Sequence, residues 1–166
     1  MFTRWLKPTK LLLTLLGNRM KILIITVGRK NDPGLDEAVS DFTDRISHYA
    51  DIEWKILPQS DVEKEGALIV GALNKRDYTV LLDEKGKAVD SPALATFIQK
   101  RLNEATHRLV FVIGGAYGVS ANVRNVARAT ISLSNLTFPH QLVRLILAEQ
   151  IYRAFTIVRG EKYHHS

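Results

Sequence analysis

The chain has 166 residues, of which 46% are hydrophobic and 24% are charged, and it contains no cysteine. This length fits one compact domain, and the composition is that of a folded globular protein rather than a disordered chain. The lack of cysteine excludes a disulfide framework and thiolate metal sites, and it fits a reducing, cytoplasmic location. The histidines show no metal-binding spacing, so we expect no metal: His48, His107, His140, His164 and His165.

The net charge of +6 is distributed unevenly along the chain. Four of these charges lie in the first nineteen residues, which contain no acid: Arg4, Lys7, Lys10 and Arg19. Residues 20–139 balance to zero, and the remaining surplus lies in the last segment: Arg144, Arg153, Arg159 and Lys162 against Glu149 and Glu161. We therefore expect an anionic partner to approach the C-terminal end.

Residues 1–19 precede MKILIITVG, a stretch typical of the start of a strand-first domain. Their apolar run LLLTLL is shorter than the about 7 to 15 residues of a signal-peptide core and the about 20 of a membrane span. We expect residues 1–19 to be an extension, disordered or upstream of a true start at Met20, and residues 20–166 to form a single domain. A targeting signal is the alternative for the first segment.

From Met20 onward, strand-like apolar runs alternate with helical patterns. The run 21–28 is followed, after a turn at Pro33 and Gly34, by a helical pattern over 35–49. The run 52–58 precedes a helical pattern over 61–76. The run 78–83 then precedes a helix for which Ser91 is the expected N-cap and Pro92 the first helical residue.

The second half continues the alternation. Strand-like runs cover 108–115 and 130–136, with a short helix from about Ser120 between them, and a helical pattern follows over 140–160. Nearly continuous apolar strands separated by helices predict an α/β fold whose parallel sheet is covered on both faces. Ligands bind at the carboxyl ends of such strands, so the candidate site lies in the loops 27–33, 82–86, 114–120 and 132–140.

The glycine-rich segment after the fourth strand, Gly114 to Gly118, would let a ligand approach the backbone closely. Its G-G-x-x-G spacing is neither a Walker A nor a dinucleotide pattern, and the region about 20 residues on lacks the acid that a ribose needs, which disfavours NAD. A tight strand-to-helix turn without a ligand is the alternative. After the third strand, Asp83, Glu84 and Gly86 indicate either a solvated turn or a ligand-facing strand end at Leu82.

The segment SLSNLTFPHQ joins the fifth strand to the last helix. It offers small polar groups from Ser132, Ser134, Asn135 and Thr137 between apolar side chains, Leu133, Leu136 and Phe138. Such a loop suits a flat, uncharged heterocycle, with backbone groups at its edge and leucines at its faces. A loop that only caps the following helix is the alternative.

The last helical pattern is too apolar for a solvent-exposed helix, so we expect part of it to be buried between subunits. Within it, Arg144, Glu149 and Arg153 form either an exposed salt-bridge set or a functional polar group at an interface. The closing GEKYHH places Tyr163 and His164 where they suit base stacking or contact with RNA phosphates. Solvated terminal residues are the alternative.

Three segments in order, VFVIGGAYG, SLSNLTFPHQLVRLILAEQIYRAF and RGEKYHH, resemble the RlmH family of SPOUT-class methyltransferases. The resemblance runs from Met20 to the end. It implies a homodimer with a trefoil knot in the C-terminal half, and S-adenosylmethionine as methyl donor. It further implies methylation at N3 of a pseudouridine in helix 69 of large-subunit ribosomal RNA, in the assembled ribosome. The implied cofactor site comprises Leu82, Gly114, Leu133, Ser134, Asn135, Leu136, Thr137 and Phe138.

The imide N3 must lose its proton before or during transfer. The candidate bases are His140, Glu149 and His164, while Arg144 and Arg153 are candidates to stabilise the anion and Tyr163 to stack on the base. Two other classes of protein remain as alternatives. One is a CheY-like or flavodoxin-like binding module, although the acids that a receiver carries after its first strand are missing. The other is a non-catalytic RNA- or ribosome-binding dimer of the same fold.

Overall fold

The computed structural model describes residues 19–165. The prediction that residues 1–19 form an extension therefore lies, for residues 1–18, outside the described residues. The described chain alternates strands and helices from the first strand to the last helix: β1 (Lys21–Val27), α2 (Pro33–Ser47), β2 (Asp51–Leu57), α3 (Val62–Gly71), β3 (Asp77–Ala88), α4 (Ser91–Asn103), β4 (Arg108–Ile113), α5 (Ala121–Val126), β5 (Ala129–Ser132) and α6 (His140–Arg159).

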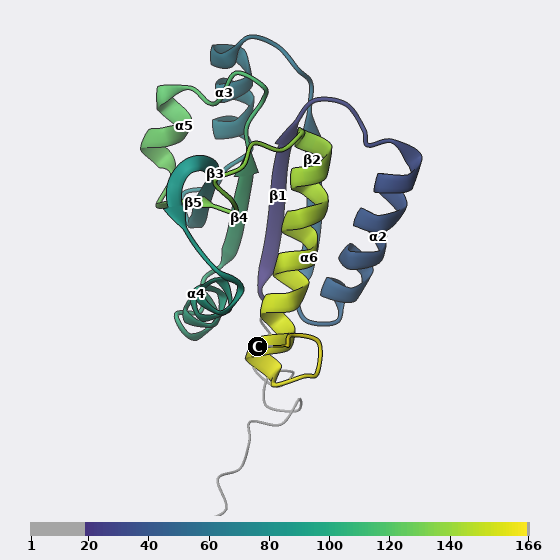
Figure 1. Ribbon diagram of the computed structural model, residues 1–166. Helices are drawn as coiled ribbons and strands as arrows, with labels where there is room; N and C mark the ends of the chain where they lie inside the picture. Colours follow the sequence, from purple (N-terminus) through teal and green to yellow (C-terminus); the bar gives the residue numbers. More distant parts are fainter. Residues whose placement is uncertain (1–18, 166) are drawn as a thin grey trace, which may run out of the picture.

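The five strands form one sheet in the order β2-β1-β4-β3-β5, and every neighbouring pair is parallel (Figure 1). The predicted α/β class is thus confirmed. The sheet places the carboxyl ends of β3, β4 and β5 side by side, although the three strands are far apart in the sequence. Within residues 19–165, no helix has the length and apolarity that crossing a membrane requires.

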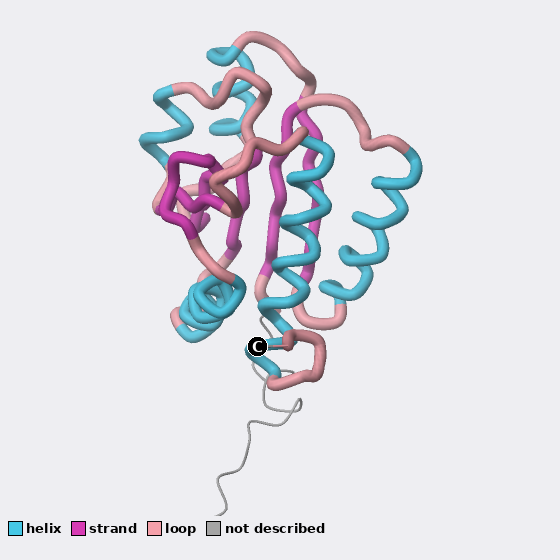
Figure 2. The backbone as a smooth tube through the Cα atoms, viewed as in Figure 1, coloured by secondary structure: helices cyan, strands magenta, loops and turns pink. Residues whose placement is uncertain are grey.

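Helices cover both faces of the sheet, as Figures 1 and 2 show. Side chains that alternate along β1 divide between two cores, because successive residues of a strand point to opposite faces. Ile22 and Ile24 belong to a larger core with side chains of α2, α4 and α6. Leu23 and Ile25 belong to a smaller core with side chains of α3 and α5. This double burial explains why the strand carries no polar alternation.

Two local predictions were wrong. Ser91 is not the N-cap of α4: Asp90 is, and its Oδ1 accepts a hydrogen bond from the Ala93 N–H at 2.8 Å, so Ser91 begins the helix. The third strand does not end near Asp83 but continues to Ala88 after a register shift between Leu82 and Lys87. The charged residues Asp83, Glu84 and Lys85 thus belong to a bulge within β3, beside β5, and not to a loop after the strand.

Candidate functional site

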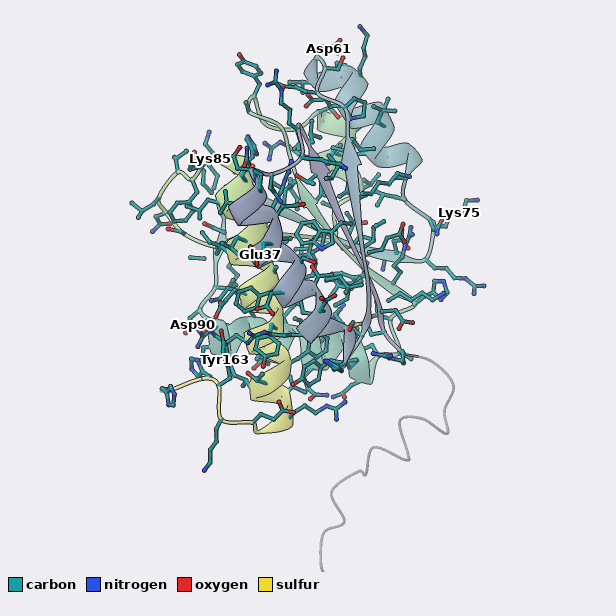
Figure 3. All side chains as sticks on the ribbon, turned by 90° about the vertical axis from the view of Figure 1, so that its right-hand side faces the viewer. Glu37, Asp61, Lys75, Lys85, Asp90 and Tyr163 are labelled. Carbon is teal, nitrogen blue, oxygen red and sulfur yellow. The ribbon has the colours of Figure 1, made fainter. Side chains whose placement is uncertain are left out.

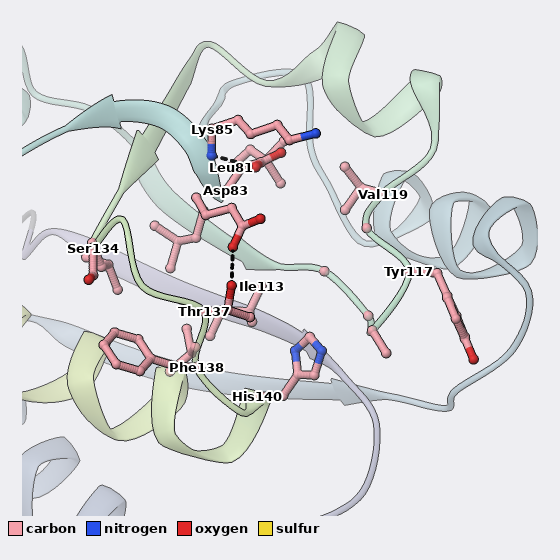
Figure 4. A pocket seen from close by; sticks show the side chains of 18 of the residues that line it. Leu81, Asp83, Lys85, Ile113, Tyr117, Val119, Ser134, Thr137, Phe138 and His140 are labelled. Carbon is pink, nitrogen blue, oxygen red and sulfur yellow. Dashed lines mark hydrogen bonds between the residues drawn. The ribbon is translucent and has the colours of Figure 1, made fainter.

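A pocket of about 400 Å³ opens at the carboxyl ends of β3, β4 and β5 (Figure 4). Three loops line it: the β3 bulge, the glycine-rich turn after β4 and the loop between β5 and α6. Of the predicted cofactor residues, seven lie in its wall: Leu82, Gly114, Leu133, Ser134, Leu136, Thr137 and Phe138. Asn135 is exposed and is not among the lining residues.

The pocket has further lining residues that were not predicted as site residues: Leu81, Asp83, Glu84, Lys85, Ile113, Gly115, Ala116, Tyr117, Gly118, Val119, Arg124 and Val143. Most of them lie in the loops that the rule for parallel sheets had indicated. Arg124 was not indicated by this rule, because it belongs to α5 and not to a loop at a strand end, yet it lines the pocket.

The glycine-rich turn is held close to the strand end. A Cβ atom at Gly114 would lie 2.5 Å from Val119 Cγ1, so no larger residue fits without a shift of the turn. Gly118 has φ of 86°, which glycine adopts without strain, and its N–H donates to the Gly115 carbonyl at 3.1 Å. The turn therefore exposes backbone at its glycines, beside the side chains of Tyr117 and Val119 that also line the pocket.

The loop between β5 and α6 is fixed by its own polar side chains. Ser132 Oγ donates to the Ser134 carbonyl at 2.8 Å, and Ser134 Oγ accepts from the Leu136 N–H at 3.0 Å. Thr137 Oγ1 donates to Glu84 Oε2 at 2.8 Å, which ties this loop to the β3 bulge across the pocket (Figure 4). The small polar residues of this segment thus shape the loop, and Leu133 and Phe138 supply apolar wall.

Charges of both signs line the pocket. Asp83 Oδ1 accepts from the Lys85 N–H at 2.9 Å, and Asp83 Oδ2 lies 2.8 Å from Arg124 Nη1. The Lys85 N–H and the Arg124 guanidinium hold the pKa of Asp83 below its usual value, so this carboxylate stays ionised near neutral pH. A ligand with separate positive and negative groups would find partners for both here.

His140 begins α6 and directs its ring into the pocket (Figure 4). Burial lowers the pKa of His140 below its usual value, and the nearby Arg144 cation lowers it further. Among the described residues, the buried Nδ1 atom has no hydrogen-bond partner. The imidazole is therefore neutral near pH 7, the state in which it can accept a proton.

Arg144 is 1% exposed and does not line this pocket. Its Nε donates to Thr26 Oγ1 at 3.0 Å, and its Nη1 donates to the Arg29 carbonyl at 2.6 Å and to Asn31 Oδ1 at 3.0 Å. These bonds hold the loop between β1 and α2 against α6. The structure thus gives Arg144 a positioning contact that the salt-bridge interpretation did not foresee.

The other four predicted catalytic residues form a separate cluster, built by the C-terminal half of α6 and the segment that follows it. Glu149 Oε1 accepts from Arg153 Nε at 2.9 Å and from Tyr163 Oη at 3.1 Å, while Arg153 Nη1 lies 3.3 Å from His164 Nδ1. The Arg153 guanidinium also lies over the Tyr163 ring, 4.7 Å from its centroid. Burial, followed by the Glu149 charge, raises the pKa of Tyr163, so this phenol is protonated and donates.

This cluster and the pocket lie at different levels of α6. The helix rises about 1.5 Å per residue, and Arg153 follows His140 by thirteen positions, so the two residues lie about 20 Å apart along the helix. In Figure 3, Tyr163 lies beside the lower half of α6, whereas Lys85 of the pocket rim lies near its upper end. Within one subunit the structure therefore unites His140 with the cofactor residues but keeps Glu149, Arg153, Tyr163 and His164 apart from them.

Among residues 19–165, no three His, Cys, Asp or Glu side chains are grouped so that they could hold a metal ion. The fold and the pocket define a parallel α/β protein with a small, partly apolar pocket at its strand ends. The family described as "Predicted SPOUT methyltransferase" matches residues 20–164. The chain belongs to this methyltransferase family, which confirms the predicted class and excludes the CheY-like or flavodoxin-like module. The trefoil knot stays a prediction.

Curated relatives are similar over nearly their whole length. A protein named "Ribosomal RNA large subunit methyltransferase H" from Parabacteroides distasonis is 44% identical over 156 residues, covering 88% of this chain and 99% of the relative. A relative of the same name from Christiangramia forsetii is 42% identical with the same coverage. Among solved structures, the SpoU methyltransferase AviRb from Streptomyces viridochromogenes in complex with AdoMet has a TM-score of 0.42 at 16% identity, covering 82% of this chain and 57% of that one.

Proposed function

We propose that this protein transfers a methyl group from S-adenosylmethionine to N3 of a pseudouridine in helix 69 of large-subunit ribosomal RNA. The observation that carries the proposal is the pocket built by the three loops after β3, β4 and β5 in a chain that belongs to a methyltransferase family. The names of the curated relatives support large-subunit ribosomal RNA as the substrate. Because ribosomes are the substrate, the proposal also places the protein in the cytoplasm.

The residues present fit S-adenosylmethionine. Leu133 and Phe138 offer apolar wall to a flat adenine, and the turn from Gly114 to Gly118 leaves backbone groups accessible at its edge. The acids Asp83 and Glu84 and the cations Lys85 and Arg124 match the ammonium, sulfonium and carboxylate groups of this donor. When bound, the donor supplies an electrophilic methyl group: the N3–CH₃ bond forms as the S–CH₃ bond breaks, and that electron pair stays on sulfur.

His140 is the base that we assign to the proton of N3. It is the one predicted base that lines the pocket, and its neutral imidazole can accept the proton that N3 loses. General base catalysis of this kind contributes about 10² to 10⁴ fold. The rest of the acceleration comes from holding donor and acceptor in line, for which proximity supplies about 7 to 11 kcal/mol.

A homodimer is part of the proposal. Arg153, Tyr163 and His164 offer a cation and two rings for contact with RNA, yet Arg153 lies about 20 Å along α6 from His140, and the other two follow the end of that helix. A second copy packed against α6 can bring its own cluster to the pocket, which a single chain in this conformation does not do. Symmetric pairing of this kind buries the same surface twice and creates two equal sites.

Transfer of labelled methyl groups tests the proposed function. Purified protein is incubated with ribosomes from a strain that lacks the modification, and nucleosides are identified by mass spectrometry. We expect one labelled product, N3-methylpseudouridine, from the large-subunit RNA. Binding of S-adenosylmethionine without transfer would favour the non-catalytic RNA- or ribosome-binding dimer. A label on another nucleoside would contradict the assigned acceptor.

A further inference from the structure

A second cavity of about 560 Å³ shares His140 with the cofactor pocket. The loop between β1 and α2 (Arg29, Asp32), Leu35, Gln59 and the first turn of α6 (Gln141, Arg144) contribute to its wall. Gly115, Ala116 and His140 line this cavity and the cofactor pocket alike. Two ligands bound on either side would therefore meet at this shared wall, which is the geometry that group transfer between them requires.

The cavity is held open by hydrogen bonds across it. Arg144 joins α6 to the loop after β1 through Thr26, Arg29 and Asn31, as described above. The Asp32 N–H donates to Gln141 Oε1 at 2.9 Å, which adds a second tie between the same loop and helix. The volume lies within the range of about 300 to 1,000 Å³ that is usual for small-ligand sites. The site thus exists before a ligand arrives.

The charge balance of the cavity favours an anion. The titratable groups in its wall are Arg29, Asp32, His140 and Arg144. No carboxylate lies within salt-bridge distance of Arg144 among the described residues, so this buried cation has no direct ion-pair partner, and the Asp36 charge acts on it only from farther away. With His140 neutral, the wall itself carries two cations, Arg29 and Arg144, and one acid, Asp32, while the carboxylates of Asp36 and Glu65 act from outside the wall. A ring that loses a proton during the reaction would be stabilised here.

We propose that this cavity, the acceptor cavity, receives the uracil-type ring whose imide nitrogen is methylated. This inference rests on the proposed function. The half-buried Leu35 and Leu142 suit the faces of a flat ring, and the amides of Gln59 and Gln141 suit its carbonyl and imide edge. The imide proton passes to His140 at the shared wall, and the new N–CH₃ bond forms on the side of the cofactor pocket.

The chain's lack of cysteine allows this inference to be tested after folding. Gln59→Cys introduces a single thiol at an exposed position of the acceptor cavity, and Lys75→Cys introduces one at an exposed position outside both cavities (Figure 3). Each folded variant is modified with a bulky methanethiosulfonate reagent and later released with a reductant. Methyl transfer to ribosomes, S-adenosylmethionine affinity and oligomeric state are measured before, during and after blocking.

Blocking Gln59→Cys should lower methyl transfer at least tenfold, leave the donor's Kd within about twofold, and be reversed by reductant. Blocking Lys75→Cys should change none of these quantities. Unchanged transfer in blocked Gln59→Cys would overturn the proposal. Loss of donor binding would also overturn it, because the cavities would then not be separate sites. Dissociation of an oligomer would instead identify the cavity as the seat of a second copy. Wild-type protein that methylates no RNA would refute the proposed function itself.

Discussion

Substitution of Gly114 by alanine tests whether the glycine-rich turn is the wall of the cofactor pocket. The new Cβ would lie 2.5 Å from Val119 Cγ1 and 3.2 Å from the Gly118 carbonyl oxygen. Carbon atoms in contact are normally about 3.5 to 4.0 Å apart, so the overlap with Val119 is about 1 Å. Val119 packs against the smaller core and its β-branched side chain has few rotamers, so the turn must move.

Overpacking of this size costs about 1 to 3 kcal/mol, which corresponds to roughly 5- to 150-fold weaker binding if the shift falls on the pocket wall. Isothermal titration with S-adenosylmethionine measures this change. Gly34→Ala is the matched control, because a Cβ there meets nothing within 4 Å. Adding Val119→Ala to Gly114→Ala removes the clashing methyl and should restore part of the affinity. A Gly114→Ala protein with wild-type affinity would show that this turn does not contact the donor.

Three further changes have defined outcomes. Arg108→Met should lower the free energy of unfolding in urea by about 3 to 5 kcal/mol, because it leaves the buried Asp77 carboxylate without its two-bond partner; a loss below about 1 kcal/mol would contradict this. His140 binds a proton more weakly in the folded protein than in the unfolded chain. Its contribution to the free energy of unfolding is therefore fully present above the pKa of the unfolded state and is lost as pH falls below that pKa. His140→Gln should therefore flatten the stability profile between about pH 7 and pH 5, and an unchanged slope would contradict the lowered pKa. Deletion of residues 163–166 should abolish methyl transfer but preserve donor binding, and normal transfer by the truncated protein would remove Tyr163 and His164 from the site.

Local patterns in the sequence predicted most of the fold. Apolar runs separated by helical patterns indicated five buried parallel strands, because only a sheet covered on both faces tolerates strands such as Lys21–Val27 without polar alternation. The boundaries were less predictable. The β3 strand continues past the charged residues of its bulge because pairing with Ile131 and Ser132 of β5 resumes at Lys87 and Ala88, and the sequence of one strand does not show which residues pair with it. The N-cap is Asp90 and not Ser91. Either side chain can accept a hydrogen bond from a backbone N–H in the first turn of the helix, so the residue types alone did not decide between them.

The candidate site was predictable where it depends on strand ends and was not where it depends on long-range packing. Leu82 lies where the β3 bulge begins, Gly114 follows β4 and Leu133 follows β5. These three strands are neighbours in the sheet, so one topological rule indicated all three loops. Arg144 and Glu149 lie five residues apart in the sequence, which gave no sign that one is buried against the loop after β1 and the other joins Tyr163. Gln59 was not predicted, since it lines one cavity together with His140 only because the loop after β2 and the start of α6 come together in the fold.

The central claim is that the cofactor pocket of one subunit works with the Glu149–Tyr163 cluster of another. Mixing two impaired variants tests this claim directly, at a concentration of S-adenosylmethionine that fills the wild-type pocket but leaves the Gly114→Ala pocket nearly empty. Gly114→Ala protein and protein lacking residues 163–166 are combined under conditions that exchange subunits, and methyl transfer to ribosomes is measured. Each mixed dimer would hold one complete site, so free exchange should restore about one quarter of wild-type activity. A mixture that stays as inactive as its two components would contradict a site shared between subunits.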